Sequence, residues 1–142
     1  MAKLEKNQTG IAGEFYVAGE LSRLGFNVTA TFGNTKSLDL LIQKAHSVYA
    51  IQVKSIQASS SLCWNIDKTK AFIEHFYILV NLDVDYPEMK PEFFVLKGNE
   101  VISLFRDTPK AGAKRAYLDY KKLLKMPEYK NRRDVFGQPS AF

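Results

Sequence analysis

The chain has 142 residues, of which 46% are hydrophobic, 25% charged and 13% aromatic, and its formal net charge is +5. This composition is typical of a globular protein and excludes a disordered, collagen-like or disulfide-rich chain, so we expect one domain over residues 1–142. The single cysteine, Cys63, cannot form an internal disulfide, and no leader or apolar run of roughly 20 residues indicates secretion or a membrane span. We therefore expect a cytoplasmic protein that does not enter a membrane.

The amino-terminal part of the chain predicts a helix followed by a strand. Apolar residues recur every three or four positions over residues 8–24, which is the pattern of a helix with one buried face. Asn7 or Thr9 is the expected cap of this helix. Polar and apolar side chains then alternate over residues 26–32, which predicts a strand.

A β-hairpin and further strands follow along the chain. Residues 38–42 (LDLLI) and 48–55 (VYAIQVKS) are predicted strands joined by a short turn, and residues 76–82 (FYILVNL) predict a strand buried on both faces. The other segments, in chain order, are an ambiguous one over 64–70, a loop over 83–91, a strand over 93–96, a short helix over 99–105 that Asn99 caps, and a long basic helix over 114–124. Together they predict an α/β fold with a central mixed sheet of about four to five strands flanked by helices.

Positive charge is concentrated in the carboxy-terminal quarter of the chain. From Arg106 onward there are ten basic and four acidic residues, whereas the first 105 residues contain ten basic and eleven acidic ones. Because Lys and Arg bind nucleic-acid phosphates by releasing condensed counterions, this basic segment over residues 106–142 predicts DNA binding. The expected contact residues are Lys114, Arg115, Lys121, Lys122, Lys125, Arg132 and Arg133. The alternative is an ordinary amphipathic helix, because Tyr117, Tyr120 and Leu123 recur at helical spacing.

Polar residues interrupt two strands that otherwise read as buried. Asp39 stands within LDLLI, and Gln52 and Lys54 alternate with Val53, so both long polar side chains project from one face of their strand. Burying such groups costs several kcal/mol unless they are paired or bound to something. If the two strands form a hairpin, Asp39 and Gln52 can lie side by side and, with Lys54, hold Mg²⁺ and a water molecule. The alternative is a simple Asp39–Lys54 ion pair on a half-exposed sheet face, with Gln52 pointing to solvent.

These segments resemble the PD-(D/E)xK nuclease superfamily, whose restriction-endonuclease-like fold occurs in many restriction enzymes and in archaeal Holliday-junction resolvases. In that superfamily a helix bearing a Glu packs beside a hairpin that carries an Asp on its first strand and an acid-x-Lys signature on its second. The corresponding segments here are GEFYVAGELSRLGFNV, SLDLLI and IQVKS, in the same order, and FYILVNLDV and PEFFVLKGNEV are similar to the remaining core strands. The resemblance covers residues 8–105 and leaves the basic helical segment outside it.

The resemblance implies a role for each matching residue. Asp39 would be the central ligand of Mg²⁺ or Mn²⁺, and Lys54 would position the attacking water or steady the developing negative charge. Glu14 is the best match to the helix Glu and would bind the metal directly or through water. Glu20 is its rival; it lies about 240° further around the helix, so only one of the two can face the site.

Gln52 departs from the pattern because it stands where the superfamily has Asp or Glu, and would be a third metal ligand. A neutral amide supplies one carbonyl oxygen and no charge, so its metal affinity is lower. Some modification-dependent restriction enzymes that resemble this superfamily also use Gln-x-Lys. Leu38 replaces the Pro of the motif, and His46 and His75 lack metal-ligand spacing, so we expect one or both to be a turn and a strand-end histidine rather than catalytic bases.

The sequence thus predicts a metal-dependent endonuclease that hydrolyses phosphodiester bonds of duplex or branched DNA and leaves a 5′-phosphate, as the resemblance implies. No glycine-rich phosphate-binding loop is present, so no nucleotide cofactor is expected. The resemblance also implies a homodimer, because a duplex has two strands to cut. The alternatives are a catalytically inactive nucleic-acid-binding module and an interaction partner in a defence or repair system.

Overall fold

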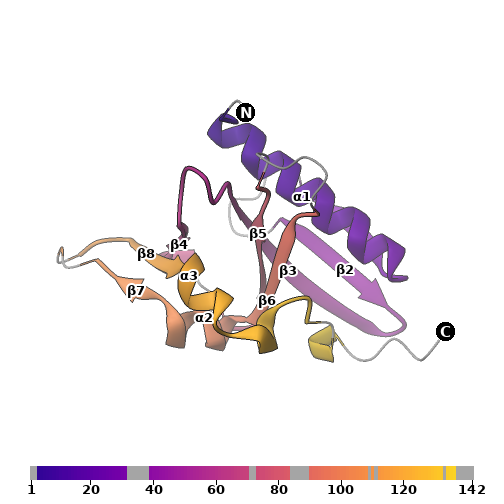
Figure 1. Ribbon diagram of the computed structural model, residues 1–142. Helices are drawn as coiled ribbons and strands as arrows, with labels where there is room; N and C mark the ends of the chain where they lie inside the picture. The colour runs from indigo at the N-terminus through magenta and orange to yellow at the C-terminus, as the bar shows by residue number, and fades with distance from the viewer. Residues whose placement is uncertain are drawn as a thin grey trace.

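The computed structural model describes residues 3–31, 39–70, 73–83, 90–108, 110, 112–132 and 134–136. Its centre is a five-stranded mixed sheet with the strand order β1-β2-β3-β5-β6 (Figure 1). The strands are β1 (Asn27–Ala30), β2 (Leu40–Lys44), β3 (Ser47–Ile56), β5 (Phe76–Asn81) and β6 (Glu92–Lys97). The pair β3–β5 is parallel and the other neighbours are antiparallel, as expected for a hairpin joined by a crossover to the rest of the sheet.

A smaller sheet and several helices surround this central sheet. The smaller sheet has the order β4-β8-β7, formed by β4 (Cys63–Asp67), β8 (Arg115–Asp119) and β7 (Arg106–Asp107). The α-helices are α1 (Lys6–Arg23), α2 (Gly98–Leu104) and α3 (Tyr120–Leu124), and the 3-10 turns are η1 (Lys68–Lys70), η2 (Pro127–Tyr129) and η3 (Asp134–Phe136). Of the described helices, none combines the length and hydrophobicity needed to cross a bilayer.

Two separate apolar clusters lie on the two faces of the central sheet. On one face, Val17 and Leu21 of α1 pack with Ile51, Val53 and Ile78 of the sheet. On the other face, the smaller sheet and the short helices cover the strands; the buried residues there include Trp64, Tyr77, Leu79, Phe94, Leu118 and Leu123. Alternate side chains of each strand therefore serve opposite layers. The predicted α/β architecture, with a mixed sheet of about five strands flanked by helices, is confirmed.

The start of α1 differs from the sequence prediction. The N-cap residue is Glu5, whose backbone N–H donates to Oε1 of Gln8 at 3.0 Å. Asn7 and Thr9 lie inside the helix, and the Thr9 hydroxyl donates back to the carbonyl oxygen of Glu5 at 3.1 Å. The prediction that Asn7 or Thr9 caps the helix is wrong. The helix begins earlier because the side chain of Gln8 accepts a hydrogen bond from the backbone N–H of Glu5, three residues before it. The cap of α2 is likewise Lys97 rather than Asn99.

The prediction of one long helix over residues 114–124 is also wrong. Its first half is strand β8, in which the buried residues Ala116 and Leu118 alternate with more exposed ones. Both pair with β4, Ala116 opposite Ile66 and Leu118 opposite Trp64. The helix α3 is confined to the last part of the predicted range, where Leu123 is buried. The ambiguous segment over 64–70 is thus strand followed by a 3-10 turn, and it supplies the partner strand that the sequence did not reveal.

Asp39 lies immediately before β2 and not within it. The predicted strands over 26–32 and 38–42 are shorter or shifted, because β1 ends at Ala30 and β2 begins at Leu40. Phe32 and Leu38 lie outside the described residues, as does most of the predicted loop over 83–91. The hairpin itself is confirmed, since β2 and β3 pair antiparallel from Leu40 opposite Ile51 to Lys44 opposite Ser47.

Candidate active site

A cleft of about 550 Å³ lies between the start of α1, the end of β3 and strand β4. The central sheet opens here because β2 pairs with β3 only as far as Ile51, so the rest of β3 runs on without β2 beside it. Glu14, Asp39 and Lys54 all line this cleft. Residues from three different segments therefore meet at the point where the hairpin separates.

Gly13 allows α1 to approach β3 closely at this point. A Cβ atom at Gly13 would lie 1.7 Å from Oγ and 2.8 Å from Cβ of Ser55, so no larger residue fits without displacement. Ser55 is the residue after Lys54 on β3, and Glu14 is the residue after Gly13 on α1. This contact consequently fixes Glu14 and Lys54 on the same cleft.

Backbone hydrogen bonds hold Asp39 in place. Its N–H donates to the carbonyl oxygen of Ile51 at 3.1 Å, and its carbonyl oxygen accepts from the N–H of Thr31 at 3.0 Å. The carboxylate Oδ2 accepts from the N–H of Val53 at 2.7 Å. Burial raises the pKa of the Asp39 carboxyl, while the Val53 N–H and the charge of Lys54 act in the opposite direction. Oδ1 has no hydrogen-bond partner among the residues that the structure describes.

Glu14 and Lys54 belong to the same electrostatic cluster. Burial raises the pKa of the Glu14 carboxyl, the charge of Asp39 raises it further, and the ammonium of Lys54 lowers it. Within the described parts of the chain, Asp39 and Lys54 do not form the ion pair that was the alternative interpretation of the sequence. The three charged groups are thus near one another without being neutralised by direct contact.

The structure does not bring Gln52 to the cleft with these groups. Its side chain is buried, and Nε2 lies 3.1 Å from Nδ1 of His75, which directly precedes β5. Burial lowers the pKa of the His75 imidazole, and a neutral ring offers one nitrogen that can accept from the amide. The expected structural role of His75 is consistent with this contact, which the sequence did not reveal because the two residues are 23 positions apart.

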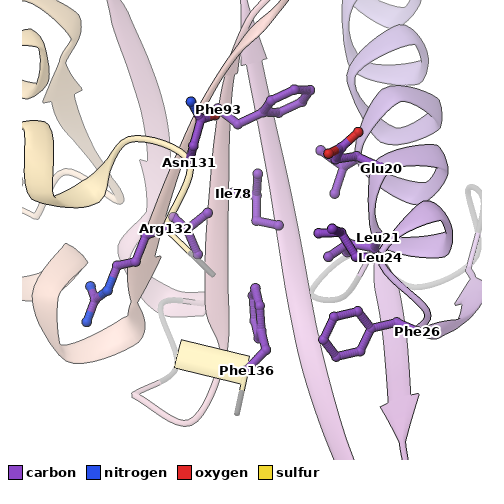
Figure 2. A pocket seen from close by; sticks show the side chains of 11 residues that line it. Glu20, Leu21, Leu24, Phe26, Ile78, Phe93, Asn131, Arg132 and Phe136 are labelled. Atoms are coloured by element: carbon purple, nitrogen blue, oxygen red, sulfur yellow. The ribbon is translucent and has the colours of Figure 1, made fainter. Parts of the chain in front are cut away.

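Glu20 lies elsewhere on α1. It pairs with Arg23 at 2.5 Å and lines a second, mostly apolar cavity of about 60 Å³. Figure 2 shows this cavity, with Glu20 and Leu21 of α1 on one side and Arg132 and Phe136 on the other. Of the two helix carboxylates that the sequence left open, the structure places Glu14 beside Asp39.

The basic residues predicted to contact DNA occupy different places. Arg115 lines the cleft, whereas Lys114, Lys121, Lys122 and Lys125 are exposed but do not line it. Arg133 lies outside the described residues.

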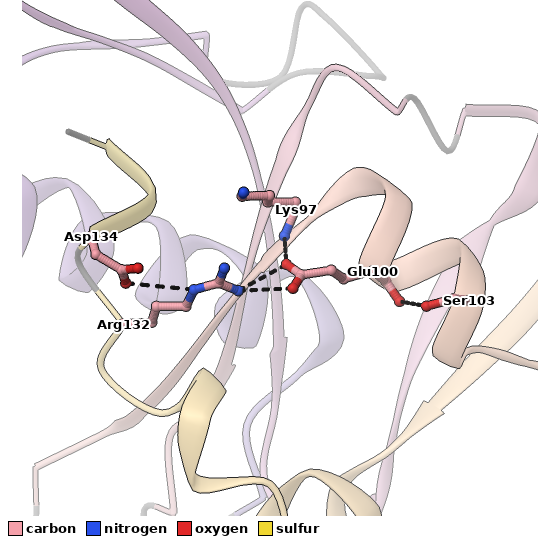
Figure 3. Close-up of polar contacts among 5 residues, drawn as sticks. All are labelled: Lys97, Glu100, Ser103, Arg132 and Asp134. Atoms are coloured by element: carbon pink, nitrogen blue, oxygen red, sulfur yellow. Dashed lines mark hydrogen bonds and ion pairs between the residues drawn. The ribbon is translucent and has the colours of Figure 1, made fainter.

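Arg132 is engaged in an ion-pair cluster instead of being available to a phosphate. Its Nη1 donates to both carboxylate oxygens of Glu100, at 2.8 and 3.0 Å, and its Nε lies 3.6 Å from Asp134 (Figure 3). Only 16% of the Arg132 side chain is exposed. This arginine therefore attaches the carboxy-terminal segment to α2.

Two further basic residues, Lys3 and Lys6, line the cleft, although the sequence did not single them out. The available signal was the spacing of Lys6, Gly10 and Glu14, because positions four apart share one face of a helix. The backbone N–H of Leu4 donates to Oε1 of Gln57 at 2.9 Å, which attaches the amino-terminal segment to the chain just after β3.

The donor set of the cleft fits a hard divalent cation. Two half-buried carboxylates, with the charge of Asp39 raising the pKa of Glu14, are the kind of oxygen ligands that Mg²⁺ and Mn²⁺ prefer. Among the described residues there is no cluster of three or more His, Cys, Asp or Glu side chains that could hold a metal. Mg²⁺ sites commonly use only one or two carboxylates together with water and substrate phosphate. Glu14 and Asp39 would be those two.

Comparisons with known proteins agree with the observed fold. No family model and no curated protein sequence matches the chain. The bacterial homing endonuclease I-Ssp6803I is similar in structure, with a TM-score of 0.53 and 15% identity over 78% of this chain and 84% of that one. The Holliday junction resolvase Hjc of Archaeoglobus fulgidus is similar with a TM-score of 0.54 and 16% identity over 79% and 84% of the two chains. The chain therefore has the restriction-endonuclease-like fold that the sequence resemblance implied.

Proposed function

We propose that this protein is a divalent-cation-dependent endonuclease that hydrolyses phosphodiester bonds of DNA in the cleft. The observation that carries the proposal is the meeting of Glu14, Asp39 and Lys54, from three separate segments, on one cleft. The likeness of the fold to a homing endonuclease and to a Holliday junction resolvase supports the same class of chemistry.

Each of the three residues has a part in this proposal. Glu14 and Asp39 would hold Mg²⁺ or Mn²⁺, and the hydrogen bond from Val53 to Asp39 fixes the orientation of that carboxylate. When bound, the cation would supply charge stabilisation at the phosphate and ease the deprotonation of a water molecule. Lys54 carries three N–H donors on a flexible stem, which suits it to orient the attacking water or to stabilise the phosphate oxygens as negative charge develops.

DNA is the proposed substrate, in duplex or branched form. Two strands of a duplex require two cuts, so we propose that two copies of the chain act together.

Cleavage of supercoiled plasmid tests the proposal. Native protein is expected to nick or linearise the plasmid with Mg²⁺ or Mn²⁺ and to leave it intact with chelator. Asp39→Asn, Glu14→Gln and Lys54→Met are expected to lower the rate at least about 100-fold, the usual effect of removing a group that acts in the transition state. Glu20→Gln is the matched control on the same helix and is expected to cut at the native rate, because Glu20 lies outside the cleft. Undiminished cutting by Asp39→Asn would refute the proposal.

A second candidate is a DNA-binding module without catalytic activity. The observation that favours it is the contact of Gln52 with His75, which leaves the third expected ligand outside the cleft. This candidate predicts that native protein and Asp39→Asn bind DNA equally well and that neither cuts it with any divalent cation.

A further inference from the structure

The cleft carries positive charge beyond Lys54, on two of its walls. Lys3 and Lys6 line it from the amino-terminal segment and the first turn of α1, and Arg115 lines it from β8. The acidic residues of the cleft are Glu14, Asp39 and Asp67. Cations on two walls of a cleft that also holds the two site carboxylates suit a polyanionic chain that passes through the cleft.

One face of α1 leads from these lysines to the site. Lys6, Gly10 and Glu14 are four residues apart, so they follow one another along the same face of the helix. A Cβ at Gly10 would have no atom within 4 Å, so the middle of this row is open space bordered by helix backbone. A phosphodiester backbone can approach the helix there, because no side chain stands in its way.

Hydrogen bonds from backbone N–H groups attach both segments that carry the basic residues of the cleft to the rest of the protein. The hydrogen bond from Leu4 to Gln57 holds the segment that carries Lys3 and Lys6 against the end of β3. Arg115 stands opposite Asp67 in the antiparallel pair of β4 and β8, and the adjacent Lys114 carbonyl accepts from the N–H of Lys68 at 2.8 Å. The basic side chains of α3 do not line this cleft, and Lys122 contacts the Leu104 carbonyl at 3.5 Å instead.

We infer that a DNA strand lies along the Lys6–Gly10–Glu14 row, with Lys3 and Lys6 holding phosphates on one side of the reactive position and Arg115 holding a phosphate on the other. The inference rests on the proposed function for the identity of the reactive position. It assigns the principal DNA contacts to the cleft and only a minor contribution to α3.

Two charge-matched variants separate the cleft from α3. The cleft variant is Lys3→Ala/Lys6→Ala/Arg115→Ala, and the comparison variant Lys121→Ala/Lys122→Ala/Lys125→Ala, called the α3 variant, removes the same charge from α3 and its C-cap. Binding to a short DNA duplex is measured in chelator at several salt concentrations. The cleft variant is expected to lose at least about tenfold in affinity, and its log K against log salt slope should become shallower by about 0.9 for each lost phosphate contact. The α3 variant is expected to lose less than about threefold. A loss in the α3 variant that equals or exceeds that in the cleft variant would overturn the inference.

A steric test leaves all charges in place. Gly10→Leu puts a bulky side chain into the open middle of the row, and leucine favours helix over glycine, so the melting temperature should not fall. DNA affinity is expected to drop at least about tenfold. Gly19→Leu is the matched control, because Gly19 also has open space around it but does not line the cleft. Native affinity in Gly10→Leu would show that the strand takes another path.

The failure of this inference is distinguishable from failure of the proposed function. Binding in chelator does not depend on cleavage. If Asp39→Asn cuts normally while the cleft variant has lost its DNA affinity, the nuclease proposal fails and the strand path stands. If Asp39→Asn has lost cleavage while the cleft variant binds normally, the path fails and the nuclease proposal stands.

Discussion

The ionised carboxylates of Glu14 and Asp39, which would bind a cation, lower the stability of the folded protein when no cation is bound. Burial raises the pKa of both carboxyl groups, and the charge of Asp39 further raises that of Glu14. A raised carboxyl pKa means that the folded protein holds its proton more tightly than the unfolded chain does, so the ionised form lowers stability. Functional groups are often kept at such a cost to stability.

This cost gives a pH dependence that can be measured in chelator. Stability contributed by protonated Asp39 is fully present below the ordinary carboxyl pKa of about 4 and is lost as pH rises through the raised pKa of the folded state. Asp39→Asn removes the charge but keeps an oxygen that can accept from Val53, so this variant should be more stable than native protein at pH 7. The gain should vanish at about pH 3.5, where native Asp39 is protonated. Urea denaturation at both pH values checks this, and lower stability of Asp39→Asn at pH 7 would contradict it.

The packing of α1 on β3 depends on a single missing side chain. Gly13→Ala would press a methyl group against Ser55, with which it cannot coexist unless the helix or strand moves. We expect a loss of about 1–3 kcal/mol in the free energy of unfolding, the usual cost of overpacking. Gly19→Ala, at an open position of the same helix, should instead gain about 0.5–1 kcal/mol from helix propensity. Denaturant unfolding of the two variants gives the comparison, and equal effects would show that α1 does not approach β3 so closely.

The attachment of the carboxy-terminal segment to α2 depends on Arg132. Because its partner Glu100 is only 23% exposed, Arg132→Ala leaves a partly buried carboxylate with the hydrogen bond from the Lys97 N–H but without the two from Arg132. We expect a loss of about 1–3 kcal/mol in the free energy of unfolding, with DNA affinity and its salt dependence unchanged. The exposed pair of Arg106 and Asp119 is the comparison, and Arg106→Ala should cost less stability. If Arg132→Ala lowered DNA affinity without lowering stability, Arg132 would be a DNA-contact residue, as the sequence predicted, and not a structural one.

The elements that could be predicted from the sequence are those in which the order of polar and apolar residues fits only one type of secondary structure. The run FYILVNL indicated a strand buried on both faces, and β5 lies between β3 and β6 in the central sheet. Residues 114–124 misled because Tyr117, Tyr120 and Leu123 also fit a helical period. The segment forms strand β8 because β4 and β7 pair with it on both sides and supply its backbone hydrogen bonds.

In the candidate site too, contacts between residues that are distant in the sequence were the ones that could not be predicted. Glu14, Asp39 and Lys54 were expected together because the resemblance to the nuclease superfamily implied it, and all three line the cleft. The positions of Gln52 and Arg132 could not, because their partners His75 and Glu100 are 23 and 32 residues away and no local pattern pairs them. Lys3 and Lys6 were missed because the prediction of DNA contacts relied on a segment rich in basic residues. It could not identify basic residues that are distant in the sequence and meet only in the folded protein.

Calorimetric titration of the metal-free protein with Mn²⁺ asks directly whether Glu14 and Asp39 form a divalent-cation site. Native protein and Glu20→Gln are expected to bind Mn²⁺ saturably. Glu14→Gln and Asp39→Asn are each expected to lose at least about tenfold in affinity, because each removes one charged oxygen ligand. Binding that is absent from native protein, or that is unchanged in Asp39→Asn, would contradict the proposed cation site.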